Sequence, residues 1–170
     1  DLPPIDFVMI SHNHYDHLDV PTLRKLAKRN PETVFFVPVG NGKLLRKNGI
    51  DQVQELNWGD RASIKDTTIH CLPTQHWSKR SLTDTRKALW SSWAVIGPQR
   101  RFYFAGDTGY FAGFKEIGDK LGPFDLAAVP IGAYEPNAMM KVSHMNPEEA
   151  VQAAVDIRAD RAVAIHFGTF

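Results

Sequence analysis

Short apolar runs alternate along the chain with segments whose apolar residues recur every three to four positions. The first run, IDFVMI at residues 5–10, is continuous and predicts a strand buried on both faces. The predicted strands are residues 5–10, 33–37, 67–72, 90–97, 100–105, 124–131 and 161–165. The predicted helices are residues 19–31, 42–49, 111–122 and 146–157. This alternation predicts an α/β fold.

The ends of two predicted helices carry recognisable signals. Pro21 lies in the first turn of the helix at 19–31, and Pro31 lies just past its end. In the helix at 146–157, Asn146 at the cap, Pro147 at the first position and Glu149 three residues on predict a capping box.

Polar clusters follow four of the predicted strands. HNHYDH at 12–17 follows the first strand, TQHW at 74–77 follows the strand at 67–72, GDTGY at 106–110 follows the strand at 100–105, and His166 follows the last. Open α/β sheets bind ligands at the carboxyl ends of their strands. The recurrence therefore predicts one site built from four strand ends.

Imidazole and carboxylate are ligands for zinc and also for non-haem iron or manganese. If the loop at 12–17 is extended, His12, His14 and Asp16 point the same way and converge, while His17 points elsewhere and can serve a neighbouring ion. The full candidate set is His12, His14, Asp16, His17, His76, Asp107 and His166. One zinc ion uses about four ligands, so this set fits two ions if a carboxylate bridges them.

Each later residue of that set also has a structural interpretation. A single histidine before a turn commonly makes a structural hydrogen bond, and Asp107 in GDTG also suits a turn. The shared position of these residues at strand ends favours the interpretation as ligands.

Composition narrows the functional classes. The 170 residues suffice for one domain with a sizeable core, and 43% of them are apolar. The net charge of +1 lacks the basic excess of a nucleic-acid-binding protein, so we expect no nucleic-acid partner. A single cysteine, Cys71, excludes an internal disulfide. No stretch approaches the roughly 20 apolar residues of a membrane span. We therefore expect a soluble or peripheral membrane protein and favour the cytoplasm.

The clusters also resemble a known family. HNHYDH, His76, GDTGY and the final IHFGTF resemble the metallo-β-lactamase superfamily with its HxHxDH signature. LPPIDFVMISHNHYDHLD, QHWSKRSLTD, LWSSWAVIGP, FYFAGDTGYF, GPFDLAAVPIGAYEP and HMNPEEAV further resemble the N-acyl-phosphatidylethanolamine-hydrolysing phospholipases D and their bacterial relatives.

The resemblance implies an αββα metallo-β-lactamase fold and a division of the ligands between two zinc ions. His12, His14 and His76 would hold one ion, Asp16, His17 and His166 would hold the other, and Asp107 would bridge. Because the chain opens at the strand before the first ligand motif, we expect residues 1–170 to be the C-terminal portion of this domain, with the first strands absent.

The implied activity is hydrolysis of a phosphodiester in N-acyl-phosphatidylethanolamine, giving phosphatidic acid and an N-acylethanolamine. Two zinc ions would lower the pKa of a bridging water to about 7 and supply hydroxide. Asp16, Asp107 and His144 are the candidate catalytic residues. The two aspartates would act as metal ligands and are poor free acids. His144 would hydrogen-bond the phosphate or the leaving group, with a surface loop histidine as the alternative.

The loop that contains His144 offers candidate substrate contacts. Tyr134, Met139 and Met140 could line an apolar entrance for acyl chains, although packing under the loop is an equal alternative. The residues Lys79, Arg80, Arg86, Lys87, Arg100 and Arg101 predict a solvated basic face, with contact to an anionic head group as the alternative.

Three functions compete at this point. The first is a dizinc phosphodiesterase for N-acylated phospholipid, with a lipid partner and peripheral membrane contact. The second is a dizinc hydrolase of the same fold for a lactone or another phosphodiester. The third is a non-catalytic descendant, which the complete ligand set disfavours. Ligands report the chemistry of a site rather than its substrate, so a panel of substrates is needed to separate the first two.

Overall fold

A computed structural model describes residues 2–168 of the chain. The chain divides into two compact units, each described here by itself. The first unit consists of Asp1–Asn57 and Trp77–Trp90, and the second consists of Trp58–His76 and Ser91–Phe170. The prediction of one partial domain at 1–170 stays a prediction.

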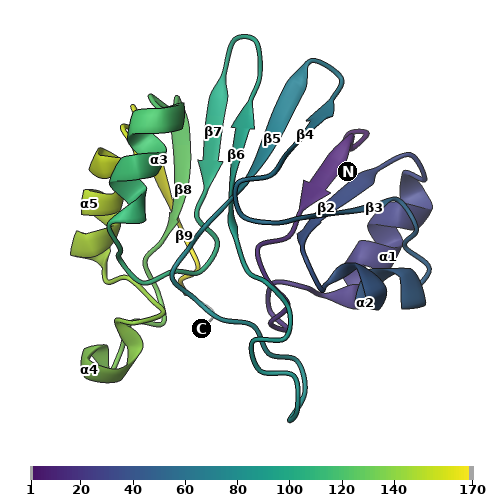
Figure 1. Ribbon diagram of the computed structural model, residues 1–170, viewed down its shortest axis with the longest axis horizontal. Coiled ribbons are helices and arrows are strands. Elements are labelled where there is room, and N and C mark those ends of the chain that lie inside the picture. Colours follow the sequence, from purple (N-terminus) through teal and green to yellow (C-terminus); the bar gives the residue numbers. More distant parts are fainter. Residues whose placement is uncertain (1, 169–170) are drawn as a thin grey trace. The chain divides into compact units, whose positions relative to one another are not determined.

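The first unit is a small parallel sheet covered by two helices. Its elements are β1 (Phe7–Met9), α1 (Val20–Arg29), β2 (Val34–Pro38), α2 (Gly42–Lys47) and β3 (Val53–Leu56). The three strands run parallel in the order β1-β2-β3. Leu23 of α1 and Leu45 of α2 are buried in one cluster with Phe35 and Val37 of β2, so both helices cover the same face of the sheet (Figure 1).

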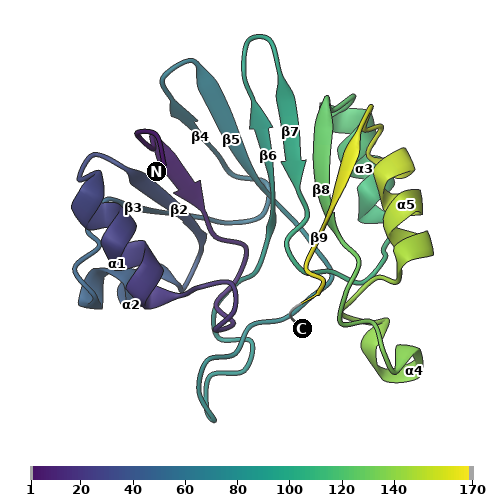
Figure 2. The same cartoon turned by 180° about the vertical axis from the view of Figure 1, so that it is seen from behind.

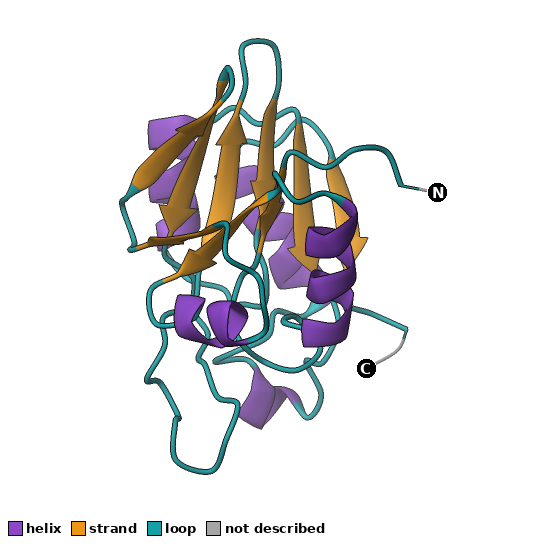
Figure 3. Cartoon of the chain, turned by 90° about the vertical axis from the view of Figure 1, so that its right-hand side faces the viewer, coloured by secondary structure: helices purple, strands orange, loops and turns teal. Residues whose placement is uncertain are grey.

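The second unit contains a mixed sheet of six strands. Its elements are β4 (Arg61–Ile64), β5 (Thr67–Leu72), β6 (Ser92–Ile96), β7 (Arg101–Phe104), α3 (Gly113–Leu121), β8 (Leu126–Pro130), α4 (Asn137–Met140), α5 (Pro147–Asp156) and β9 (Ala162–Ile165). The strands lie in sequence order from β4 to β9. Figure 2 shows α5 beside β8 and β9, and Figure 3 separates helices from strands by colour.

The core of the second unit lies between the sheet and the helices α3 and α5. Phe114 of α3 and Ala153 of α5 are fully buried in one cluster with Tyr103 of β7 and Ala127 of β8. The thiol of Cys71 on β5 is also fully buried, and burial raises its pKa to about 12. This thiol is therefore protonated and unreactive at neutral pH.

The predicted strands and helices are confirmed, with ends that differ by a few residues. The capping box is present as expected: Asn146 accepts a hydrogen bond from the Glu149 amide at 2.8 Å, and Glu149 accepts one from the Asn146 amide at 3.1 Å. In α1, Asp19 accepts a hydrogen bond from the Thr22 amide at 3.0 Å and so caps the helix.

Three elements were not predicted, and one prediction was wrong. The pattern gave no indication of β3, β4 or the single turn α4, because each is only four residues long. β3 and β4 are also edge strands and therefore carry exposed polar residues. Residues of β1 are only half-buried, because β1 is itself an edge strand and not the twice-covered strand that its apolar run suggested.

Within residues 2–168, no helix has the length and apolar character that crossing a membrane requires.

Candidate metal centre

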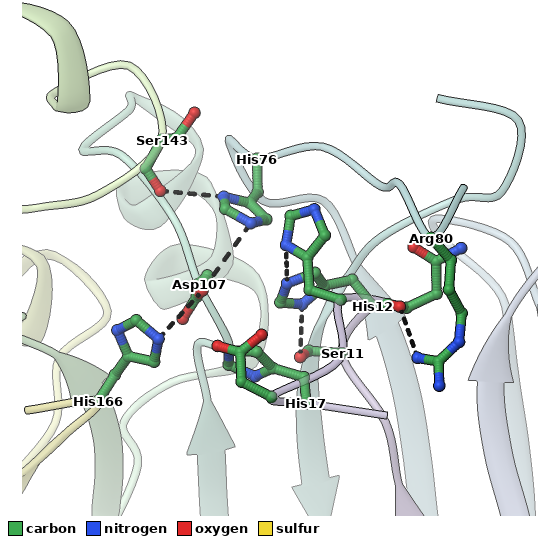
Figure 4. Close-up of polar contacts among 11 residues, drawn as sticks. Ser11, His12, His17, His76, Arg80, Asp107, Ser143 and His166 are labelled. Carbon is green, nitrogen blue, oxygen red and sulfur yellow. Dashed lines mark hydrogen bonds and ion pairs between the residues drawn. The ribbon is translucent and has the colours of Figure 1, made fainter. Parts of the chain in front are cut away.

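The first cluster of candidate ligands lies in the loop that follows β1. His12 is buried, and its Nε2 lies 2.8 Å from Nδ1 of His14 (Figure 4). On the other side of the ring, the Ser11 hydroxyl lies 3.0 Å from His12 Nδ1. The Ser11 hydroxyl thus orients the His12 ring, whose second nitrogen is directed at His14.

The remaining two residues of the first cluster lie in a turn. The amide of Leu18 donates to the His14 carbonyl at 2.8 Å, so residues 14–18 curl back instead of running extended. Oδ2 of Asp16 lies 3.1 Å from Nε2 of His17. The expectation that Asp16 would join His12 and His14, with His17 pointing elsewhere, was wrong, because it assumed an extended loop. The turn pairs Asp16 with His17.

The second unit brings together ligands from three strand ends. β5 and β7 are both antiparallel to β6, and β7, β8 and β9 are mutually parallel, so β5, β7, β8 and β9 all point the same way. Their carboxyl ends therefore share one edge of the sheet. His76 follows β5, Asp107 follows β7 and His166 follows β9 at that edge.

Asp107 is the centre of this second cluster. Its carboxylate oxygen Oδ2 lies 3.4 Å from Nε2 of His166 and 3.8 Å from Nε2 of His76 (Figure 4). Only 3% of Asp107 is exposed. His166 has a φ of 56°, a left-handed conformation that is costly for a residue with a Cβ. The sheet edge thus holds a strained histidine against a buried carboxylate, an arrangement that is common at functional sites.

The backbone fixes which nitrogen of His76 faces Asp107. His76 Nδ1 lies 3.0 Å from the Ser143 carbonyl oxygen, which can only accept a hydrogen bond, so Nδ1 carries the proton. In the neutral tautomer this leaves the lone pair on Nε2, the nitrogen that lies 3.8 Å from Oδ2 of Asp107. A backbone carbonyl behind a ligating histidine is a common way to set its orientation and basicity.

His144 belongs to the same group. Its ring stacks on His166 with a centroid separation of 5.7 Å and meets His76 edge-on at 5.1 Å. One ligand atom from each of His76, Asp107 and His144 lies within 4.8 Å of the others, so His144 has the geometry of a ligand. Its assignment to the substrate stays a prediction.

The other predicted substrate residues lie in the segment before His144. Met139 and Met140 form the end of α4, and Met139 is 76% exposed, whereas Met140 and Tyr134 are half-buried. Their assignment to the substrate stays a prediction.

Sequence reasoning missed one residue that contacts the ligand loop. Arg80, predicted to lie on a solvated basic face, is half-buried and donates to two carbonyl oxygens of the first unit's ligand loop. The sequence gave no indication of this contact, because an arginine that bonds a loop and an arginine exposed to solvent have the same sequence pattern.

Both clusters suit a metal ion by the chemistry of their donors. The first contains His12, His14, Asp16 and His17. The second contains His76, Asp107, His144 and His166, and His76, Asp107 and His144 are close enough together to hold one ion. Imidazole nitrogen and carboxylate oxygen are ligands for zinc, iron and manganese. The clusters are therefore able to bind metal.

Comparison with known proteins identifies the family. Residues 1–167 match the family described as "Beta-lactamase superfamily domain". The chain belongs to the beta-lactamase superfamily. This membership confirms the predicted α/β fold class of the metallo-β-lactamase type.

The chain is similar to two curated relatives and to one solved structure. It is 50% identical to N-acyl-phosphatidylethanolamine-hydrolyzing phospholipase D 1 of Caenorhabditis elegans, over 100% of the chain and 51% of the relative. It is 36% identical to the mitochondrial N-acyl-phosphatidylethanolamine-hydrolyzing phospholipase D of Saccharomyces cerevisiae, over 100% of the chain and 38% of the relative. The structure of Igni18, a metallo hydrolase of Ignicoccus hospitalis, superposes with a TM-score of 0.78 at 26% identity, covering 97% of the chain and 65% of Igni18.

The chain spans about half the length of the C. elegans relative and less of the yeast one.

Proposed function

We propose that the chain is the metal-binding region of a metal-dependent phosphodiesterase of phospholipase D type. The substrate would be N-acyl-phosphatidylethanolamine, which water would cleave at a phosphorus–oxygen bond to give phosphatidic acid and an N-acylethanolamine. The observation that carries this proposal is the 50% identity to the C. elegans enzyme across the whole chain. The protein would then bind a lipid surface through peripheral contact.

The proposed cofactor is a pair of zinc ions, with iron or manganese as alternatives. His12, His14 and His76 would serve one ion, Asp16, His17 and His166 would serve the other, and Asp107 would serve both. When bound, such a pair activates water at neutral pH and stabilises negative charge on the phosphate. The donor chemistry of the two clusters supports this assignment.

The roles of the chain's own residues follow from their contacts. The Ser143 carbonyl keeps the proton of His76 on Nδ1 and so leaves Nε2 available as a ligand. Asp16 and Asp107 would be ligands, which leaves His144 to donate a hydrogen bond to the phosphate or to the departing alcohol. Its burial, with 9% exposed, would strengthen such a bond by excluding water.

An acyl chain would be met by the segment before His144. Exposed methionine side chains form adaptable apolar surfaces, and Met139 is the most exposed of the three candidates. Met140 and Tyr134 would complete this contact.

The reaction can be tested by mass spectrometry of products from the full-length protein. A mixture of N-acyl-phosphatidylethanolamine, other phosphodiesters and lactones should yield N-acylethanolamine and phosphatidic acid as the main products. Cleavage of a lactone or of a different phosphodiester, with the N-acylated phospholipid untouched, would replace the proposed substrate with another one.

A variant of His144 tests its assignment. His144→Ala should keep the zinc content of the wild type and lose roughly 10²–10³-fold in turnover, as expected for one hydrogen bond to developing charge. His144→Gln, which retains a donor, should recover part of the loss if the role is hydrogen bonding and little if His144 transfers a proton.

Two results would contradict this assignment. Loss of zinc in His144→Ala would make His144 a ligand, in keeping with its distance from His76 and Asp107. Near-normal turnover with full zinc content would make it a residue of the loop alone.

A further inference from the structure

The loop that carries the first ligand cluster is bonded at both ends to one side chain. Nη1 of Arg80 donates to the Asn13 carbonyl oxygen at 3.0 Å and to the Leu18 carbonyl oxygen at 2.8 Å. Between these two carbonyls lie His14, Asp16 and His17. A single nitrogen, with its two hydrogens, therefore closes the segment that contains three of the four ligands of the first cluster.

The two bonds hold the loop firmly because of their chemistry. Hydrogen bonds from a charged donor are stronger than neutral ones, and a guanidinium has a planar, fixed arrangement of N–H groups. Asn13 is buried with 6% exposed, and Leu18 is fully buried in the apolar core of the first unit. A carbonyl in such surroundings that lost its donor would be left poorly solvated.

The ring of Tyr15 covers the same guanidinium. The carbon Cζ of Arg80 lies 4.1 Å from the centroid of the Tyr15 ring, and the Tyr15 hydroxyl donates to the Arg80 carbonyl oxygen at 3.1 Å. Tyr15 itself belongs to the ligand loop, between His14 and Asp16. Arg80 and the loop thus contact each other through hydrogen bonds and a cation–π contact.

The segment around Arg80 is held in place by its own contacts. Oδ1 of Asp84 accepts hydrogen bonds from the amides of Arg80 at 2.9 Å and Ser81 at 2.7 Å. These amides hold the pKa of the Asp84 carboxyl below its usual range, so the acceptor is ionised at neutral pH. Trp77 meets the His14 ring edge-on, with centroids 4.6 Å apart. These contacts fix the backbone around Arg80, so its side chain can hold the ligand loop in place.

We propose that Arg80 is the positioning residue of the first ligand cluster, and that it sets the shape of the turn at residues 14–18, which carries His14, Asp16 and His17. The inference rests on the proposed function, because it takes His14, Asp16 and His17 to be metal ligands. Arg80 acts through the Asn13 and Leu18 carbonyls, at the two ends of that turn.

The test measures metal binding by the metal-free, full-length protein, without any substrate. Zinc affinity would be obtained by competition with a chelator, and the ligand geometry from the visible spectrum after loading with Co²⁺. Arg80→Ala should lower zinc affinity about 10–100-fold, the usual effect of losing a group that orients a ligand. It should also change the Co²⁺ spectrum, which a general loss of stability would not do in protein that remains folded and loaded.

Two further variants keep the test decisive if Arg80→Ala does not fold. Arg80→Lys retains a cation that can donate to carbonyls and should recover part of the zinc affinity. Tyr15→Ala changes a residue that is 67% exposed, so the fold should tolerate it, and it should weaken zinc binding in the same direction by less. Lys87→Ala, an exposed cation of the same segment, is the matched control and should behave as the wild type.

Wild-type affinity and an unchanged Co²⁺ spectrum in folded Arg80→Ala would overturn the inference, even if the Michaelis constant rose. If Arg80→Ala does not fold, wild-type binding by both Arg80→Lys and Tyr15→Ala would overturn it in the same way. A wild-type protein that binds no zinc or Co²⁺ would instead refute the proposed function, and the inference would fall with it.

Discussion

Replacing Asp107 by asparagine tests whether its carboxylate bridges two metal ions or binds only one. The change keeps the size of the side chain and one oxygen but removes the negative charge from a position that is 3% exposed. Oδ2 of Asp107 lies within 3.4 Å of His166 Nε2 and 3.8 Å of His76 Nε2, and the proposal assigns these two histidines to different ions. Asp107→Asn should therefore weaken the binding of both ions, whereas His166→Ala should weaken the binding of one.

The size of the effect follows from these contacts. Removing a single group that orients a metal ligand costs about 10–100-fold in affinity, and removing a ligand should cost at least as much. If Asp107 serves both ions, the product of the two binding constants should fall by about 10²–10⁴-fold. At about 1.4 kcal/mol per tenfold change, this is about 2.8–5.6 kcal/mol. His166→Ala should reduce the free energy of metal binding by about half of that amount, and the whole loss should fall on the binding of one ion.

The assay is a zinc titration of metal-free, full-length protein against a chelator, with elemental analysis of the saturated samples. The wild type should approach two equivalents of zinc. Thermal transitions of the metal-free variants would verify that both are folded. A variant Asp107→Asn that binds one ion with wild-type affinity would show that Asp107 does not bridge, and a wild type that saturates at one equivalent would refute the two-ion proposal.

Two further predictions concern the second unit. Gly132→Ala should lower zinc affinity, because a Cβ at this position would clash with the His166 carbonyl oxygen and displace that ligand. The control is Gly97→Ala, where the atom nearest to the added Cβ would be 3.4 Å away. Equal zinc affinity in the two variants would contradict the prediction. Tyr110→Phe should lower the free energy of unfolding by about 1 kcal/mol, because the Tyr110 hydroxyl donates to Asp156 at 2.6 Å. That bond raises the pKa of Tyr110 above its ordinary value near 10, so the stabilisation is complete below about pH 10 and is lost as the pH rises through the raised pKa. Chemical denaturation at several pH values would measure this, and a difference between variant and wild type that persists unchanged well above pH 10 would contradict it.

The gathering of ligand side chains at strand ends could be predicted, because the direction of each strand determines the edge at which its carboxyl end lies. His76, Asp107 and His166 are far apart in the sequence, yet each follows an apolar run, and the parallel direction of β5, β7 and β9 brings them to one edge. The capping box of α5 was predictable for a similar reason, since its two hydrogen bonds depend only on residues three apart.

The turn at residues 14–18 could not be predicted in the same way. HNHYDH has no glycine or proline that would distinguish a turn from an extended loop, so alternation of side chains gave the wrong partner for Asp16. The turn depends on the bond from the Leu18 amide to the His14 carbonyl, and Leu18 is fixed by burial in the core. Long-range packing therefore decided a local conformation.

The two clusters are held by different means, and this difference predicts where each is vulnerable. In the first, a side chain far along the sequence, Arg80, bonds the loop carbonyls. In the second, the main chain does the corresponding work: the Gly109 amide donates to the Gln75 carbonyl at 2.8 Å, and the Ser143 carbonyl orients His76. A side chain can be deleted by one substitution, whereas a backbone group persists in every substitution except one to proline at a donor. Among substitutions of residues that are not themselves ligands, the second cluster should therefore be sensitive chiefly to added bulk, as at Gly132, and the first to the loss of the Arg80 charge.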